Sequence, residues 1–172
     1  MKKLCIIVAL LTIIIVAFAI GQKEEISQTE YLRIHIRANS DSDCDQDIKE
    51  SVKTAVVNYL TPYISSATNR DDALTTIENR EGEVKKVVDS VLVRYGFCYK
   101  STVSVKREQF PTRTYDGVTL PSGVYDALVI DLGNGEGNNW WCVVYPPLCF
   151  TSSSVDYEYK SKIKEIIDEF FR

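Results

Sequence analysis

The chain contains a single histidine, His35, and lacks the short motifs that position catalytic side chains. It has no G-x-S-x-G, no H-E-x-x-H and no Asp-Thr-Gly or Asp-Ser-Gly segment, so a Ser-His or Cys-His dyad would have to use His35. No two cysteines form a C-x-x-C pair, and the spacing therefore matches no zinc site. The glycine-rich residues 133–137 run into two tryptophans rather than a helix, so they build no phosphate cradle. We expect no catalytic set, metal or cofactor.

Positive charge is also scarce. The chain has 20 Lys and Arg against 24 Asp and Glu, a formal net charge of −4 at pH 7, and no block of basic residues. Nucleic-acid binding needs clustered positive charge to displace counterions from phosphates. The composition therefore argues against a nucleic-acid partner.

Only one long apolar run is present, at residues 4–20, where Thr12 is the sole polar side chain. It follows Lys2 and Lys3 and ends in Ala17-Phe18-Ala19, which is typical of a secretory signal with small residues at the cleavage site. Its length is also at the short end of a membrane span. We expect residues 1–20 to be a signal peptide or an N-terminal membrane anchor, and residues 21–172 to be one extracytoplasmic domain.

In the first part of that domain, the apolar residues first recur at every second position and then at helical spacing. Strict alternation over 31–37 predicts a half-buried strand, with the aliphatic side chains inward and Arg33, His35 and Arg37 outward. Helices are expected at about 45–60, ending at Pro62, and at about 71–95, where Gly82 permits a break near 79–82.

After about residue 98, apolar and polar residues alternate again. Strands are expected at 99–106, 118–120, 124–131 and 139–145, and the last two should form a hairpin. The tail at 157–172 has apolar residues at helical spacing and should dock on the body or on another molecule. We predict an α+β fold with a mainly antiparallel sheet, an antiparallel two-helix hairpin on one face and a C-terminal amphipathic helix.

An acidic cluster follows the first strand. Asp41, Asp43, Asp45 and Asp47 alternate like the first half of a calcium loop, but the glycine and glutamate that an EF-hand needs further on are absent. The other interpretation is a strand-to-helix turn whose carboxylates cap the helix and suit the positive end of its dipole.

The segment at 139–150 is unusually aromatic. Trp140 and Trp141 are adjacent on a predicted strand, so they should point to opposite faces of the sheet. A tryptophan exposed beside Tyr145, Pro146 and Pro147 would be a good anchor for a protein partner. The alternative is that a loop or the C-terminal helix covers it.

Four cysteines follow the apolar run, and an even number in an exported domain suggests two disulfides. The helical hairpin would bring the start of its first helix beside the end of its second, so Cys44 should pair with Cys98. Cys142 and Cys149 would then pair across the Pro-Pro bend. Closing this short loop should stabilise the folded state by about 2.5 kcal/mol on the chain-entropy model. The alternative is that Cys44 and Cys98 are buried free thiols.

Four segments together resemble one known family. They are Leu-Arg-Ile-His-Ile-Arg-Ala-Asn-Ser-Asp-Ser-Asp at 32–43, Gln-Phe-Pro-Thr at 109–112, Leu-Pro-Ser-Gly-Val-Tyr at 120–125 and the residues at 133–150, which include Asn-Trp-Trp-Cys-Val-Val-Tyr-Pro-Pro-Leu-Cys-Phe. Their order is similar to that of stage II sporulation protein R, over nearly the whole chain and including the export signal. Cys44 and Cys98 are not part of the family's pattern.

The resemblance implies a secreted signal made in the forespore of endospore-forming bacteria. It would enter the space between the two septal membranes and switch on a membrane-embedded aspartic protease of the mother cell, which processes the precursor of the mother-cell sigma factor. It would not itself be an enzyme. Asn39 and Asp41 of the first segment join the aromatic residues as expected partner contacts. A secreted hydrolase acting on the septal wall and a calcium-dependent adhesion module stay open as alternatives.

Overall fold

The computed structural model describes residues 28–115 and 117–149. Its main sheet has four strands in the order β2-β5-β1-β6. These are β1 (Leu32–Arg37), β2 (Ser101–Phe110), β5 (Gly123–Leu132) and β6 (Asn139–Tyr145). β1 runs parallel to β5 and antiparallel to β6, and β2 is antiparallel to β5. The architecture is α+β with a mixed, mostly antiparallel sheet and three α-helices in the described residues.

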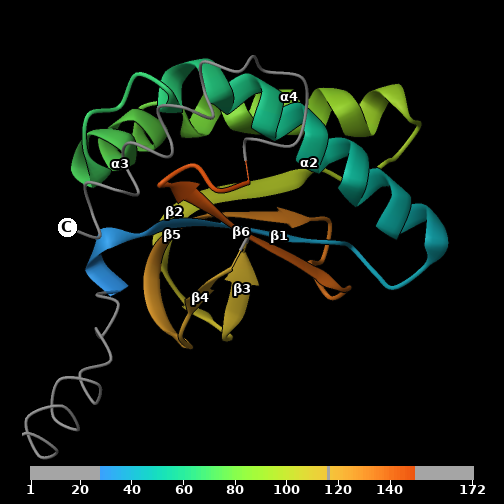
Figure 1. Cartoon of the computed structure of the whole chain (residues 1–172). Coiled ribbons are helices and arrows are strands. Elements are labelled where there is room, and N and C mark those ends of the chain that lie inside the picture. Colours follow the sequence, from blue (N-terminus) through green and yellow to red (C-terminus); the bar gives the residue numbers. More distant parts are fainter. Residues whose placement is uncertain (1–27, 116, 150–172) are drawn as a thin grey trace, which may run out of the picture.

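The three helices cover one face of the sheet (Figure 1). α2 (Asp43–Ile64) packs antiparallel to α4 (Glu81–Arg94), and the short α3 (Arg70–Glu78) connects them. The break that Gly82 permits is therefore confirmed. Pro62, expected to end the first helix, lies inside α2. A proline so near the C-terminal end removes only one backbone hydrogen bond, and the two further residues bury Ile64 in the core.

Each face of the sheet has its own apolar core. On the helical side, Leu32, Ile34 and Ile36 of β1 pack with the inward side chains of the helices, such as Val52 and Val88. The other side is covered by the hairpin of β3 (Arg113–Tyr115) and β4 (Val118–Leu120), which forms a separate two-stranded sheet (Figure 1). Tyr31, Phe110, Leu120, Tyr125, Val143 and Leu148 are among the buried residues of this second core.

The second core corrects the expected exposure of β1. Arg33 and His35 were predicted to face outward, but their exposed fractions are 0% and 2%, and only Arg37 is half-buried. The reason lies in the strand order. β6 does not pair with β5 as the expected hairpin would; β1 lies between them, so both its edges are hydrogen-bonded and both its faces are covered.

The outer edge of β2 is closed by α4. The Asp89 carboxylate accepts hydrogen bonds from the backbone N–H and the hydroxyl of Ser101, both at 2.8 Å. Glu81 accepts the N–H of Val105 at 3.0 Å. Acidic side chains of the helix thus bind N–H groups that β2 would otherwise offer to another strand.

The two ends of the chain lie outside the described residues. The expected export segment at 1–20 and the expected amphipathic helix at 157–172 both fall there. Within the described part of the chain, no helix combines the length and apolar character that crossing a membrane requires.

Candidate partner-binding surface

Two loops bind each other at one end of the sheet. The first, residues 38–42, joins β1 to α2, and the second, residues 133–138, joins β5 to β6. The Asn39 Oδ1 atom accepts the N–H of Asn134 at 3.0 Å, and the N–H of Gly137 donates to the carbonyl of Ala38 at 2.9 Å. The Asp41 carboxylate accepts the N–H of Asn138 at 2.7 Å. We call the exposed and half-exposed residues of this junction the two-loop surface: Asn39, Asp41, Asn134, Glu136, Asn138, Asn139 and Trp140.

The glycines of the second loop allow this close approach. A Cβ atom at Gly137 would lie 2.2 Å from the carbonyl oxygen of Ser40, and one at Gly133 would lie 2.2 Å from Oδ1 of Asn39. Gly133 also has a φ of +56°, a left-handed conformation that strains other residues. The loops therefore fit each other only because these positions have no side chain.

Asp45 anchors the junction to the helical layer. Its Oδ2 accepts hydrogen bonds from Asn39 Nδ2 at 2.9 Å and from Ser40 Oγ at 2.6 Å, and its Oδ1 accepts the hydroxyl of Tyr99 at 2.6 Å. Burial would raise the pKa of Asp45, but the hydrogen bonds, led by the one from Ser40, together lower it. The carboxylate is held as an anion by the protein's own donors.

The acidic cluster lies at the strand-to-helix turn, but a serine rather than one of its carboxylates caps the helix. Ser42 is the N-cap of α2, and its side chain accepts the N–H of Asp45. Among residues 28–115 and 117–149, no group of three or more His, Cys, Asp and Glu is placed to hold a metal ion. Asp41 and Asp45 are occupied by hydrogen bonds within the chain, which is the structural rather than the calcium-loop interpretation.

The two tryptophans point to opposite faces of β6, as predicted, and both are half-buried. Trp140 packs on the helical core, with Lys53 Nζ 5.8 Å from its ring centre. Trp141 packs in the second core. Tyr145, Pro146 and Pro147 are buried, so they do not form the exposed patch that was expected of them. Tyr145 is the last residue of β6 and belongs to the core on the helical side, and the two prolines follow it directly.

A buried polar cluster in the second core was not foreseen. The Arg33 guanidinium lies 4.1 Å from the ring centre of Phe110 and 5.0 Å from that of Tyr125, and it donates to the Tyr115 hydroxyl at 2.5 Å and to the carbonyl of Cys142. Its Nη1 atom has no partner among the described residues. Burial lowers the pKa of Arg33, and Tyr115 opposes that shift. Alternation marked Arg33 as outward, and only the aromatic residues at 110, 115 and 125 hinted at a second core.

His35, the chain's one histidine, is not placed as a general base. Its Nε2 is 2.8 Å from Oδ1 of Asn139, its ring is stacked on Trp141, and its Nδ1 is buried without a partner among the described residues. Burial is the main cause that lowers the pKa of His35. Among the described residues, no cysteine thiol or serine hydroxyl is hydrogen-bonded to the ring, so the described residues form no nucleophile–base dyad around it.

The four cysteines that the structure describes divide into one bonded pair and two free thiols. Cys142 and Cys149 form the expected disulfide, with Cα atoms 6.2 Å apart. The expected Cys44–Cys98 bond is wrong: both residues are exposed and free, and they are not the buried thiols of the alternative either. The helix ends do meet, but Asp45 and Tyr99 make the contact, and Cys44 and Cys98, one position earlier in each segment, face solvent.

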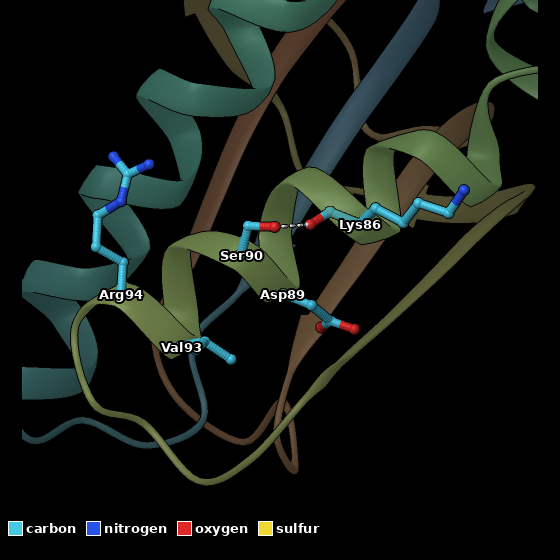
Figure 2. A pocket seen from close by; sticks show the side chains of 5 residues that line it. All are labelled: Lys86, Asp89, Ser90, Val93 and Arg94. Carbon is cyan, nitrogen blue, oxygen red and sulfur yellow. Dashed lines mark hydrogen bonds between the residues drawn. The ribbon is translucent and has the colours of Figure 1, made fainter.

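The outward side of α4 forms a pocket lined by Lys86, Asp89, Ser90, Val93 and Arg94 (Figure 2). Its polar groups are largely engaged locally. The Ser90 hydroxyl donates to the carbonyl of Lys86 at 2.7 Å, and Asp89 is bound to Lys85 and Ser101. The pocket therefore lacks an activated nucleophile.

Comparison with known proteins agrees with the four sequence segments. A family model described as stage II sporulation protein R matches residues 28–155. Stage II sporulation protein R of Bacillus subtilis (strain 168) is 33% identical over 180 aligned residues, which cover 98% of this chain and 79% of that protein. No solved structure matches the fold. The chain belongs to the stage II sporulation protein R family.

Proposed function

We propose that this sporulation protein is exported into the space between the forespore and mother-cell membranes. There it activates a membrane-embedded aspartic protease of the mother cell, which then processes the precursor of the mother-cell sigma factor. It acts as a signal and not as an enzyme. The family membership supports this role, and the apolar run at 4–20 supports export.

The observation that carries the proposal is the two-loop surface. Two of the four segments that resemble the family, at 32–43 and 133–150, supply its residues. They lie far apart in the chain but are bound together by backbone and side-chain hydrogen bonds. A surface held in one conformation loses little entropy when a partner binds, which favours recognition.

The surface combines acidic, amide and aromatic groups. Asp41, Glu136, Asn138 and Asn139 are exposed residues, although the side-chain oxygen of Asn139 is bound to His35, and Trp140 is half-buried at the margin. This composition suits a protein partner that offers basic or hydrogen-bonding groups around an apolar contact. We propose that the outer part of the protease binds here.

The test is co-expression with the protease and its precursor in a cell that lacks the rest of sporulation. The full chain should promote cleavage of the precursor, and a version lacking residues 2–20 should not, because it stays in the cytoplasm. Equal activation by the cytoplasmic version would show that the proposal is wrong.

A matched pair of charge reversals tests the surface. Glu136→Lys changes the two-loop surface, and Glu78→Lys makes the same change at the exposed end of α3, at the other end of the helical layer (Figure 1). We expect Glu136→Lys to lower cleavage by roughly tenfold and Glu78→Lys to leave it unchanged. Melting curves of both variants should match the parent. Equal effects of the two variants would exclude the two-loop surface as the contact.

A further inference from the structure

The first turns of α2 lie at the same end of the molecule as the two loops (Figure 1). Gln46 and Lys49 are three positions apart in this helix, so they lie on one face of it. The Gln46 Nε2 atom donates a hydrogen bond to the carbonyl of Ser40, in the first loop, at 2.8 Å. The Lys49 Nζ atom donates to the carbonyl of Asn138, in the second loop, at 3.2 Å. Each loop is therefore held by its own side chain of α2.

The two side chains are also bound to each other. Lys49 Nζ donates to Oε1 of Gln46 at 2.6 Å, so the contacts run without a gap from Ser40 through Gln46 and Lys49 to Asn138. The N–H of Asn138 donates to Asp41 at 2.7 Å, which holds this residue on its other side. We call Gln46 and Lys49 the helix bridge, because they join the two loops through α2.

Lys49 is buried without a counter-charge that the structure describes. Its exposed fraction is 7%, and lysine is rarely buried unless it is paired. The ion pairs within the described residues involve Lys53, Lys85, Lys86 and Lys106 but not Lys49, whose two acceptors are neutral oxygens. Replacing a buried charge by an apolar side chain of similar volume is often neutral or stabilising. The contribution of Lys49 is therefore to be sought in what it holds.

Lys49 holds the more exposed of the two loops. Glu136 and Asn138 of this loop are exposed, and the loop leads directly into Asn139 and Trp140 of the two-loop surface. Three of the five residues at 133–137 are glycines, which lose more conformational entropy on ordering than other residues do. The helix bridge orders this loop before a partner binds, so binding does not have to supply that entropy.

We propose that Gln46 and Lys49 are positioning residues of the partner-binding surface. They hold the carbonyls of Ser40 and Asn138, so that the exposed groups of both loops are presented to the partner in one arrangement. They act through the loops and not by contact with the partner. The inference rests on the proposed function, because it assigns a role within the same surface.

Positioning residues have a distinct functional signature. Their loss frees the loops but leaves the groups that the partner contacts in place. Fewer molecules are then competent to bind at any moment, and the apparent dissociation constant rises accordingly. The complex that does form is unchanged. More exported protein is needed for half-maximal precursor cleavage, while maximal cleavage is retained.

Amide hydrogen exchange of the purified full chain measures the order of the loops directly. The N–H groups of Asn134, Gly137 and Asn138 report the loop contact, because each donates across it. Lys49→Met keeps the aliphatic stem but loses the ammonium group. It should speed exchange of these three amides by roughly tenfold, the effect of losing one hydrogen bond to a charged group. The amides of β5 should exchange no faster than in the parent, and unchanged exchange at all three loop amides would overturn the proposal.

Two controls separate positioning from charge and from stability. Lys86→Met makes the same substitution on the exposed side of α4. Val88→Ala opens a cavity in the helical core and lowers the free energy of unfolding. Loop amides exchange through local opening, so neither control should change their rates. Equal acceleration in Lys49→Met and in either control would contradict a specific role for Lys49.

A double-mutant cycle tests whether the bridge acts as a unit. Gln46→Leu removes both the donor to Ser40 and the acceptor of Lys49, so it should also speed exchange of the loop amides. Because the two residues share a hydrogen bond, the double variant should show less acceleration than the product of the two single effects. Two effects that multiply fully would exclude a joint bridge.

Precursor cleavage supplies the functional readout, with variants compared over a range of exported protein levels. Lys49→Met should need roughly tenfold more protein than the parent for half-maximal cleavage, in proportion to its loss of loop order, and should reach the same maximum. Lys86→Met and Val88→Ala should follow the parent at equal protein levels. A lowered maximum for Lys49→Met, or a curve equal to that of the parent, would overturn the proposal. The exchange rates are measured without the protease, so a failure of the bridge is distinct from a failure of the proposed signalling role.

Discussion

The indole of Trp141 lies nearly flat against the imidazole of His35, with ring centroids 3.5 Å apart and planes inclined by 20°. The two residues are direct cross-strand partners in the pairing of β1 with β6. Phe110 closes the group edge-on, with its centroid 4.7 Å from that of Trp141. The stack therefore fixes the register of β6 on the side of the sheet that carries no helices.

This stack should make stability depend on pH. Burial, the largest influence, lowers the pKa of His35 from its ordinary 6.5, and the charge of Arg37 adds to this, while the hydrogen bond with Asn139 and the charges of Glu108 and Asp131 oppose it. Well above pH 6.5 the imidazole is neutral in both the folded and the unfolded chain, so its titration does not change the free energy of unfolding. As the pH falls below 6.5, the unfolded chain takes up a proton that the folded chain resists, so stability decreases.

Denaturant unfolding between pH 7.5 and 5 measures the effect. We expect the parent to lose stability over this range, and His35→Phe, which can still stack but cannot titrate, to lose less. Asp45 and Asp89, whose pKa values are lowered, add their own losses only at more acidic pH. Parallel curves for parent and variant would contradict the prediction.

The two tryptophans should separate stability from signalling. Trp141→Ala removes the ring that packs on His35 and Phe110 and should cost about 3 kcal/mol of unfolding free energy. Trp140→Ala, at the margin of the two-loop surface, should cost less but reduce precursor cleavage more than its stability loss explains. Melting curves and cleavage assays of both variants decide. A large stability loss in both would leave no anchor at this surface.

Arg33 should be replaceable by an apolar residue. Its guanidinium is fully buried, Nη1 lacks a partner in the described residues, and no carboxylate there forms an ion pair with it. Replacing a buried charge by an apolar side chain of similar volume is often neutral or stabilising by about 1–4 kcal/mol. We expect Arg33→Met to keep or raise the melting temperature and Tyr115→Phe to lower it, because the guanidinium then loses another acceptor. A strong loss in Arg33→Met would reveal an unseen counter-charge.

The fit of the two loops can be tested with two glycine substitutions. Gly137→Ala places a Cβ on the Ser40 carbonyl and should destabilise the protein and impair signalling. Gly82→Ala, in the first turn of α4, meets nothing within 4 Å and should stabilise the helix by about 0.5–1 kcal/mol. Calorimetry of both variants is sufficient. Equal and small effects would show that the loops can move apart.

Local sequence patterns predicted most helices and strands, but they did not predict which strands pair in the sheet. Helices, strands and the break at Gly82 follow from periodicity and glycine placement, which act over a few residues. The insertion of β1 between β5 and β6 is a long-range pairing that no local pattern records. Because that insertion was missed, Arg33 and His35 were assigned to the surface, although alternation only says that they share a face.

The candidate site shows the same division. Asn39 and Asp41 were expected at the partner surface from their motif, and the aromatic segment marked Trp140. The contact of the 38–42 loop with the 133–138 loop depends on tertiary structure, as does the choice of Asp45 and Tyr99 over Cys44 and Cys98. Two segments can be adjacent without any given pair of their side chains meeting. This is why a correct helix arrangement still led to a wrong disulfide.

The closure of β2 by α4 has a consequence for assembly. Asp89 is bound to Ser101 and Glu81 is bound to Val105, so the edge of β2 resists pairing with a strand from another molecule. The sheet therefore cannot be extended from this edge by strands of further molecules. Both acids belong to the helix, so α4 has to be in place before the edge is protected. A chain that has formed its strands but not yet docked α4 would be the species most prone to aggregate, and substitutions at Glu81 and Asp89 should lower the yield of folded protein more than they lower its final stability.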